Sequence, residues 1–126
     1  ATAAVSLGPE WPVRADDMLR EIVVGDWEGW LVREIAEASG LPDDIEAYAF
    51  YEAAPNGEGF AALRARVLSF LSALKAPSVL VTHGITSRMI RTLATGRDLD
   101  RFDELPGGQG VVYRVRDGQH EALSGP

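Results

Sequence analysis

Hydrophobic residues recur at helical spacing in the second half of the chain. Between positions 60 and 74 they lie three or four residues apart: Phe60, Leu63, Val67, Leu71 and Leu74. This spacing predicts a helix over 60–74 with one apolar face, which Pro77 ends. A second helix is predicted over 85–94, with Gly96 just past its end.

Shorter helical patterns come before this pair. One helix is predicted over 31–39, and another over 43–53 with Asp43 or Asp44 as its N-cap. Residues 1–7 have the pattern of the end of a helix. The chain therefore alternates short helices with loops rich in glycine and proline before it reaches the longer pair.

Two further runs predict strands. Residues 78–82 (SVLVT) are rich in β-branched side chains and have the length of a buried strand. Residues 110–116 (GVVYRVR) form the second run, and Asp117-Gly118 predicts a two-residue hairpin turn into a return strand that ends at Leu123. The order of helices and strands predicts an α/β domain with a largely parallel sheet and an antiparallel hairpin at the end.

The composition is that of one globular domain. The 126 residues include 46% hydrophobic and 25% charged positions, ordinary values for a soluble protein. The net charge of −7, with scattered arginines, disfavours nucleic acid as a partner. No apolar run approaches the roughly 20 residues that span a membrane. The absence of cysteine excludes disulfides, thiolate metal sites and a cysteine nucleophile, and it fits a cytoplasmic location.

The junction after the 78–82 run places a histidine where ligands bind. His83 follows this predicted strand directly, and the carboxyl ends of strands form the binding edge of open α/β sheets. Gly84 opens the next helix, whose free N–H groups favour anions such as phosphate. A cationic His83 could then bind a phosphoryl oxygen. The alternative is a partly buried histidine whose ring nitrogens are satisfied locally.

A second candidate lies in LREIVVGDWEG, residues 19–29. By position alone Glu21 is one carboxylate among many, and most such side chains are solvated. A carboxylic acid beside a phosphoryl group can protonate a departing oxygen, a contribution of about 10²–10⁴-fold in rate. The residues alone therefore leave Glu21 as a solvated carboxylate without this role.

Both segments resemble the histidine phosphatases, the phosphoglycerate-mutase-like superfamily. Thr-His-Gly at His83 is similar to the second catalytic-histidine region of that family, and residues 19–29 are similar to its Leu-x-Glu-x-x-x-Gly-x-x-x-Gly stretch. The resemblance implies that Glu21 is the general acid and base, and that His83 and Gly84 bind the phosphoryl group. It also implies a three-layer α/β/α sandwich with a mostly parallel sheet.

The resemblance covers nearly the whole chain as a single domain, 1–126, that lacks the N-terminal Arg-His-Gly segment with the family's nucleophile. Without that central strand the sheet would expose unpaired edges, so the chain is expected to be unstable or to self-associate as a homo-oligomer. The implied activity is hydrolysis of a small phosphorylated metabolite through a phosphohistidine, with no metal or cofactor. The alternatives are mutase-type transfer, which the compactness of the chain disfavours, and a non-catalytic binding module.

Four other charged residues give weaker signals. Glu58 lies just ahead of the 60–74 helix and is expected to cap it or to complement its dipole. Arg66 matches an arginine often found on that helix in the family, with a solvated surface charge as the alternative. Arg88 and Arg91 lie more than a turn past the start of the 85–94 helix and are expected at the surface.

Overall fold

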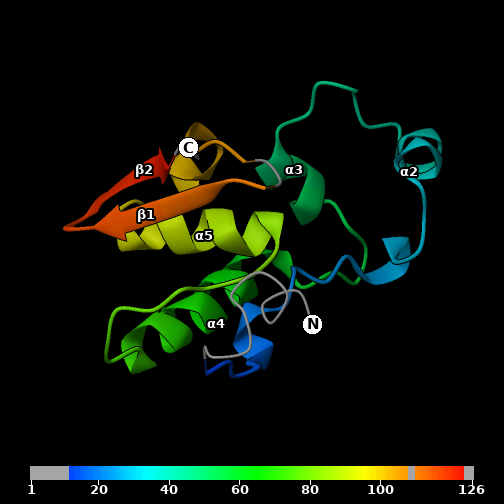
Figure 1. Ribbon diagram of the computed structural model, residues 1–126. Helices are drawn as coiled ribbons and strands as arrows, with labels where there is room; N and C mark the ends of the chain where they lie inside the picture. Colours follow the sequence, from blue (N-terminus) through cyan, green and yellow to red (C-terminus); the bar gives the residue numbers. More distant parts are fainter. Residues whose placement is uncertain (1–11, 108–109, 124–126) are drawn as a thin grey trace.

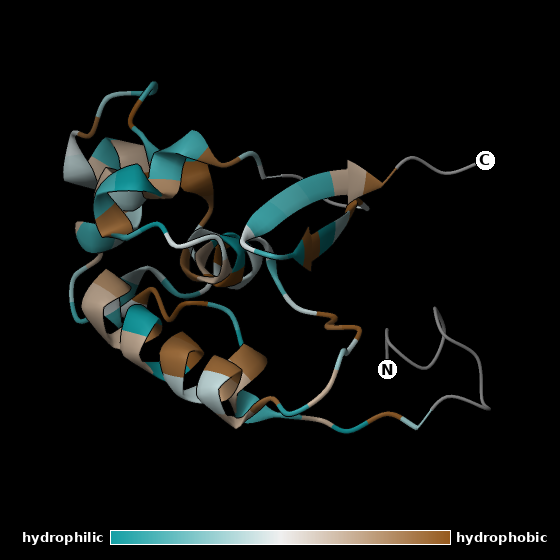
Figure 2. Cartoon of the chain, turned by 90° about the vertical axis from the view of Figure 1, so that its left-hand side faces the viewer, coloured by the Kyte–Doolittle hydropathy of each residue, from teal (hydrophilic) through white to brown (hydrophobic). Residues whose placement is uncertain are grey.

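The computed structural model describes residues 12–107 and 110–123, and helices dominate in them (Figure 1). The elements follow one another as η1 (Asp17–Leu19), η2 (Gly25–Trp27), α2 (Val32–Ser39), α3 (Ala47–Glu52), α4 (Gly59–Ala73), α5 (Gly84–Ala94), η3 (Leu99–Glu104), β1 (Val112–Arg116) and β2 (Gln119–Leu123), where η denotes a 3-10 helix. α5 lies between α4 on one side and the β1–β2 hairpin on the other (Figures 1 and 2). The helix end predicted over 1–7 lies outside the described residues. No helix in the described ranges is both long and apolar enough to cross a membrane.

The core forms where the apolar face of α4 meets α5 and η3. The fully buried hydrophobic side chains are Phe60, Leu63 and Val67 of α4, Met89 of α5 and Phe102 of η3. The rings of Phe60 and Phe102 meet edge to face with centroids 4.8 Å apart, a favoured aromatic geometry. The helices predicted over 60–74, 85–94 and 31–39 are confirmed as α4, α5 and α2, with ends that agree to within one residue.

The helix predicted over 43–53 is shorter than expected. α3 begins at Ala47, so the proposed N-caps Asp43 and Asp44 are wrong. A first-turn amide of α3 donates instead to the Asp103 carboxylate, 3.2 Å away in η3. A tertiary contact therefore satisfies the helix start that a local cap was expected to satisfy.

The C-terminal hairpin agrees with its sequence signal. β1 and β2 pair antiparallel, with Val112 opposite Leu123. Asp117 and Gly118 at the turn both have positive φ, 53° and 75°. Two successive positive φ values match the right-handed twist of the flanking strands, which is why Asp-Gly is favoured at this position.

The strand predicted over 78–82 is not formed in the described part of the chain. Within those residues the only sheet is the two-stranded β1–β2 pair, so a three-layer sandwich with a parallel sheet is not confirmed. Figure 2 shows the hydrophobic stretch between α4 and α5 as a coil. Val79 and Val81 are 60% and 39% exposed. A strand exists only with a hydrogen-bonded neighbour, and 78–82 has none among the described residues.

Candidate active site

Glu21 reaches across the fold to the first turn of α5. Its Oε2 accepts a hydrogen bond from the Ile85 N–H and its Oε1 accepts one from the Thr86 N–H, both at 3.0 Å. The N–H of the following residue, Ile22, donates to Oε1 at 2.9 Å. First-turn amides have no acceptor inside their helix, so the carboxylate satisfies them and complements the helix dipole. The structure thus brings together two segments that lie 64 residues apart in the sequence.

His83 stands at the N-cap of α5 with its side chain exposed. Its backbone is extended, with φ −110° and ψ 165°, and its carbonyl accepts the Ser87 N–H at 2.7 Å. The imidazole makes no capping hydrogen bond to the helix. Exposure argues against the alternative of a buried, locally satisfied histidine. The ring is available to a ligand that reaches the start of α5.

Gly84 is the first residue of α5 and borders open space. A Cβ built at this position would meet no atom of the described residues within 4 Å. Since Glu21 already accepts from Ile85 and Thr86, the Gly84 N–H is the first-turn amide that has no partner among the described residues. The start of α5 therefore presents fewer main-chain donors to an anion than the sequence pattern suggested. Phosphate binding by Gly84 and His83 stays a prediction.

Two threonine hydroxyls join the Glu21 segment to α5 and to the chain just before it. Thr82 Oγ1 donates to the Leu19 carbonyl at 2.6 Å. Thr86 Oγ1 lies 2.7 Å from the Arg20 carbonyl and 3.1 Å from Glu21 Oε1. A hydroxyl has one proton to donate, so Thr86 donates mainly to the Arg20 carbonyl oxygen, the nearer of the two acceptors. The main chain on the N-terminal side of Glu21 is thereby fixed to the structure that carries His83.

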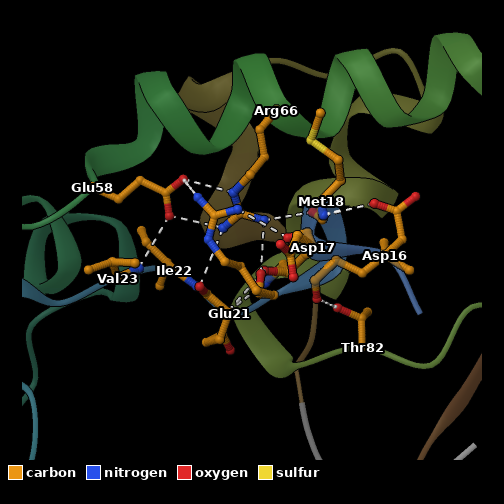
Figure 3. A network of polar contacts seen from close by, with 12 residues as sticks. Asp16, Asp17, Met18, Glu21, Ile22, Val23, Glu58, Arg66 and Thr82 are labelled. Carbon is orange, nitrogen blue, oxygen red and sulfur yellow. Dashed lines mark hydrogen bonds and ion pairs between the residues drawn. The ribbon is translucent and has the colours of Figure 1, made fainter.

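On the opposite side of this segment, Arg66 of α4 is buried against Glu58 (Figure 3). The Glu58 carboxylate accepts hydrogen bonds from Arg66 Nε at 2.8 Å and Nη2 at 2.9 Å, and a third from the Val23 N–H at 3.2 Å. The Arg66 side chain is only 8% exposed, so its reading as a solvated charge is wrong. Glu58 makes no side-chain capping bond to α4, because its carboxylate is taken up by this pair.

A comparison with protein-family models agrees with the two motifs. The model of the histidine phosphatase superfamily (branch 1) matches residues 1–122. The chain belongs to the histidine phosphatase superfamily. This superfamily has an α/β fold, and its members carry out phosphatase and mutase-type phosphoryl transfer. Neither the curated proteins nor the solved structures contain a match to the chain.

In this histidine phosphatase chain, Gly25 is required by both its conformation and its neighbours. Its φ is +53°, and a Cβ would lie 2.3 Å from the Pro55 carbonyl oxygen. That oxygen accepts the Asp26 N–H at 2.9 Å, which holds η2 against the loop before α4. Trp27 of η2 is buried against Phe50, with ring centroids 5.3 Å apart. The glycine motif therefore shapes the loop that follows Glu21, and Trp27 is a core residue.

The two arginines of α5 lie away from its N-terminus and pack against other elements of the fold. Arg91 is 3% exposed, so its predicted surface position is wrong. Its guanidinium lies 3.8 Å from the centroid of the Tyr113 ring, where it holds the hairpin onto α5. Arg88 lies 5.2 Å from the centroid of the Phe102 ring and 3.7 Å from Asp103. Within the described ranges no group of three acidic or histidine side chains is placed to hold a metal ion.

The Glu58 carboxylate gives the stability of this chain a predictable pH dependence. Burial alone would raise the pKa of Glu58, but hydrogen bonds from Arg66 and Val23 and the charges of Arg66 and Arg20 outweigh it and lower the pKa below its usual value of 4.5. A lowered pKa in the folded state adds stability above pH 4.5, and that stability is lost as the pH falls through the folded value.

The expected result is that Glu58→Gln loses less thermal stability than wild type between pH 7 and pH 3. Thermal unfolding followed by circular dichroism measures it. Glu37→Gln, at an exposed position of α2, is the control and should follow wild type. An unchanged pH dependence in Glu58→Gln would contradict the expected role of this carboxylate.

Proposed function

We propose that this chain forms part of the active site of a phosphomonoesterase that hydrolyses a small phosphorylated metabolite through a phosphohistidine. One observation carries the proposal. The Glu21 carboxylate accepts a hydrogen bond from the Ile85 N–H at the start of α5, and Ile85 is two residues after the exposed His83. A proton-transferring carboxylate and a cationic group for phosphoryl oxygens are the two functions that this chemistry needs beside the nucleophile.

In the proposed reaction the nucleophile is a histidine of an Arg-His-Gly segment, a motif that residues 1–126 do not contain. Its ring nitrogen forms a bond to phosphorus as the bond to the departing oxygen breaks, and Glu21 gives that oxygen a proton. Water then attacks phosphorus, Glu21 takes a proton from it, and the N–P bond breaks to release inorganic phosphate. His83 holds a phosphoryl oxygen in both steps, with the Gly84 N–H as a second donor.

The same proposal extends to the sheet. Val79 and Val81 are exposed, as are hydrophobic side chains of β1 such as Val112 at 63%, and 78–82 has no backbone partner among the described residues. These features suit two edges of a larger sheet. A strand from the Arg-His-Gly segment would supply the missing backbone partners. The complete domain would then be a three-layer α/β/α sandwich with a mostly parallel sheet, which places the nucleophile beside His83.

His83→Ala tests this function in the full natural protein. Loss of one group that stabilises transition-state charge typically costs about 10²–10³-fold in turnover. Release of inorganic phosphate from a panel of phosphomonoesters measures it, and circular dichroism checks the fold, which should survive because His83 is exposed. His120→Ala is the matched control, since this histidine lies on β2 against Tyr113. Wild-type turnover in His83→Ala would overturn the proposal.

A second candidate is a non-catalytic module that binds a phosphorylated ligand. The 126 residues contain two histidines, and neither follows an arginine. If the full natural protein has no Arg-His-Gly segment, it should bind inorganic phosphate in a His83-dependent way and release none from esters. Transfer of a labelled phosphoryl group to a second hydroxyl, in preference to water, would instead identify a mutase.

A further inference from the structure

Arg66 uses its whole hydrogen-bonding capacity on the segment that carries Glu21. Nε and Nη2 donate to the two oxygens of Glu58, Nη1 donates to the carbonyls of Met18 and Arg20 at 2.7 and 2.9 Å, and Nη2 donates to the Glu21 carbonyl at 3.4 Å. A guanidinium has five N–H donors, so none is left over. Figure 3 shows the side chain descending from α4 onto these carbonyls.

From this arrangement we propose that Arg66 is a positioning residue for Glu21, with Glu58 as its counter-ion. The inference rests on the proposed function in one respect, the catalytic role of Glu21. The contacts themselves are independent of any substrate. Arg66 approaches the main chain at Arg20 and Glu21 from α4, while the Glu21 side chain extends away toward α5.

The Arg20 carbonyl links Arg66 of α4 to Thr86 of α5. It accepts from Arg66 Nη1 at 2.9 Å and from the Thr86 hydroxyl at 2.7 Å, so both of its lone pairs are used. Thr86 is fully buried, and its N–H also donates to Glu21. Movement of the carbonyl away from Arg66 would therefore disturb the same turn of α5 that Glu21 contacts.

Glu58 makes the arrangement possible at a buried position. Its side chain is 9% exposed and that of Arg66 is 8% exposed, so neither charge could be left unpaired at this depth. The carboxylate orients the guanidinium through two parallel hydrogen bonds and also accepts the Val23 N–H, two residues beyond Glu21. A lysine has three donors on a point charge and cannot reproduce this set.

The experiment uses hydrogen exchange, because the Ile85 and Thr86 amides owe their hydrogen bonds to Glu21. Glu21→Ala should make both amides exchange at least about tenfold faster, the effect of losing a charge-assisted hydrogen bond. Arg66→Lys should raise the exchange rates of the same two amides by a similar factor. In a protein that already carries Glu21→Ala, Arg66→Lys should raise these rates no further. Arg64→Lys is the control, since Arg64 is on the same helix as Arg66 but pairs with Asp98, whose side chain is 62% exposed. Wild-type exchange in a folded Arg66→Lys variant would overturn the proposal.

Turnover of the full natural protein separates this inference from the proposed function. If Arg66 acts through Glu21, Arg66→Lys should lower kcat in the wild-type background and leave it unchanged in Glu21→Ala. A purely structural role would lower kcat by the same factor in both backgrounds and would overturn the inference. Suppose that Glu21→Ala has wild-type turnover while the Ile85 and Thr86 amides exchange as predicted above. The proposed function would then be overturned, and the positioning of Glu21 by Arg66 would stand. If Arg66→Lys does not fold, Glu58→Gln takes its place, and failure of both to fold would assign the pair a structural role only.

Discussion

Glu21→Gln should slow phosphomonoester turnover of the full natural protein by about 10²–10⁴-fold, the usual contribution of a general acid and base. Glutamine keeps the size of the side chain and one oxygen acceptor for the start of α5. It cannot give or take the proton that the departing oxygen and the attacking water require. The fold should therefore persist while the chemical step fails.

Steady-state kinetics with the best ester found for wild type measures this effect, with circular dichroism as a check of folding. Glu28→Gln is the matched control, because Glu28 is an exposed carboxylate in the same segment. It should keep turnover within about threefold of wild type, as surface substitutions usually leave the native structure intact. A Glu21→Gln enzyme that is as fast as wild type would exclude Glu21 as the proton donor.

Arg66→Met should produce a large loss of stability, about 3–5 kcal/mol in the free energy of unfolding. The substitution removes one partner of a buried ion pair and leaves the Glu58 carboxylate without compensation. It also leaves the carbonyls of Met18, Arg20 and Glu21 without a donor that they have in the wild type. Buried polar groups that lose their partners are among the costliest outcomes of a single substitution.

Urea unfolding followed by circular dichroism measures this loss. Arg64→Met is the comparison, because its partner Asp98 is 62% exposed and exposed ion pairs contribute only about 0–1 kcal/mol. Both arginines are on α4, so loss of helix propensity is the same in the two variants. A difference of less than 1 kcal/mol between them would show that the buried pair contributes no more than the exposed one.

Local patterns predicted α2, α4, α5 and the hairpin well. The apolar spacing from Phe60 to Leu74 requires a helix if those side chains are to share one face, and α4 buries that face. Asp117-Gly118 favours the two positive φ values that a tight hairpin needs. Each of these signals depends on a few neighbouring residues, so no knowledge of the rest of the fold was needed.

The stretch 78–82 shows where local patterns fail. Its β-branched residues are suited to a strand, but a strand also needs backbone partners from elsewhere. Within the described ranges no backbone group supplies them, and the segment remains a coil with exposed valines. In the same way, α3 begins later than expected, and one of its first-turn amides donates to Asp103, far along the chain, and not to a local cap.

For the candidate site, the sequence by itself determined which residue types are present and where they stand locally. His83-Gly84 at the start of a helix, and Glu21 in its glycine-punctuated segment, follow from short motifs. The tertiary structure alone decided that Glu21 contacts α5 and that Arg66 is buried beside it with all five donors used. The physical reason is that a side chain's hydrogen-bond partners depend on which elements pack together, and the spacing of residues along a chain does not contain that information.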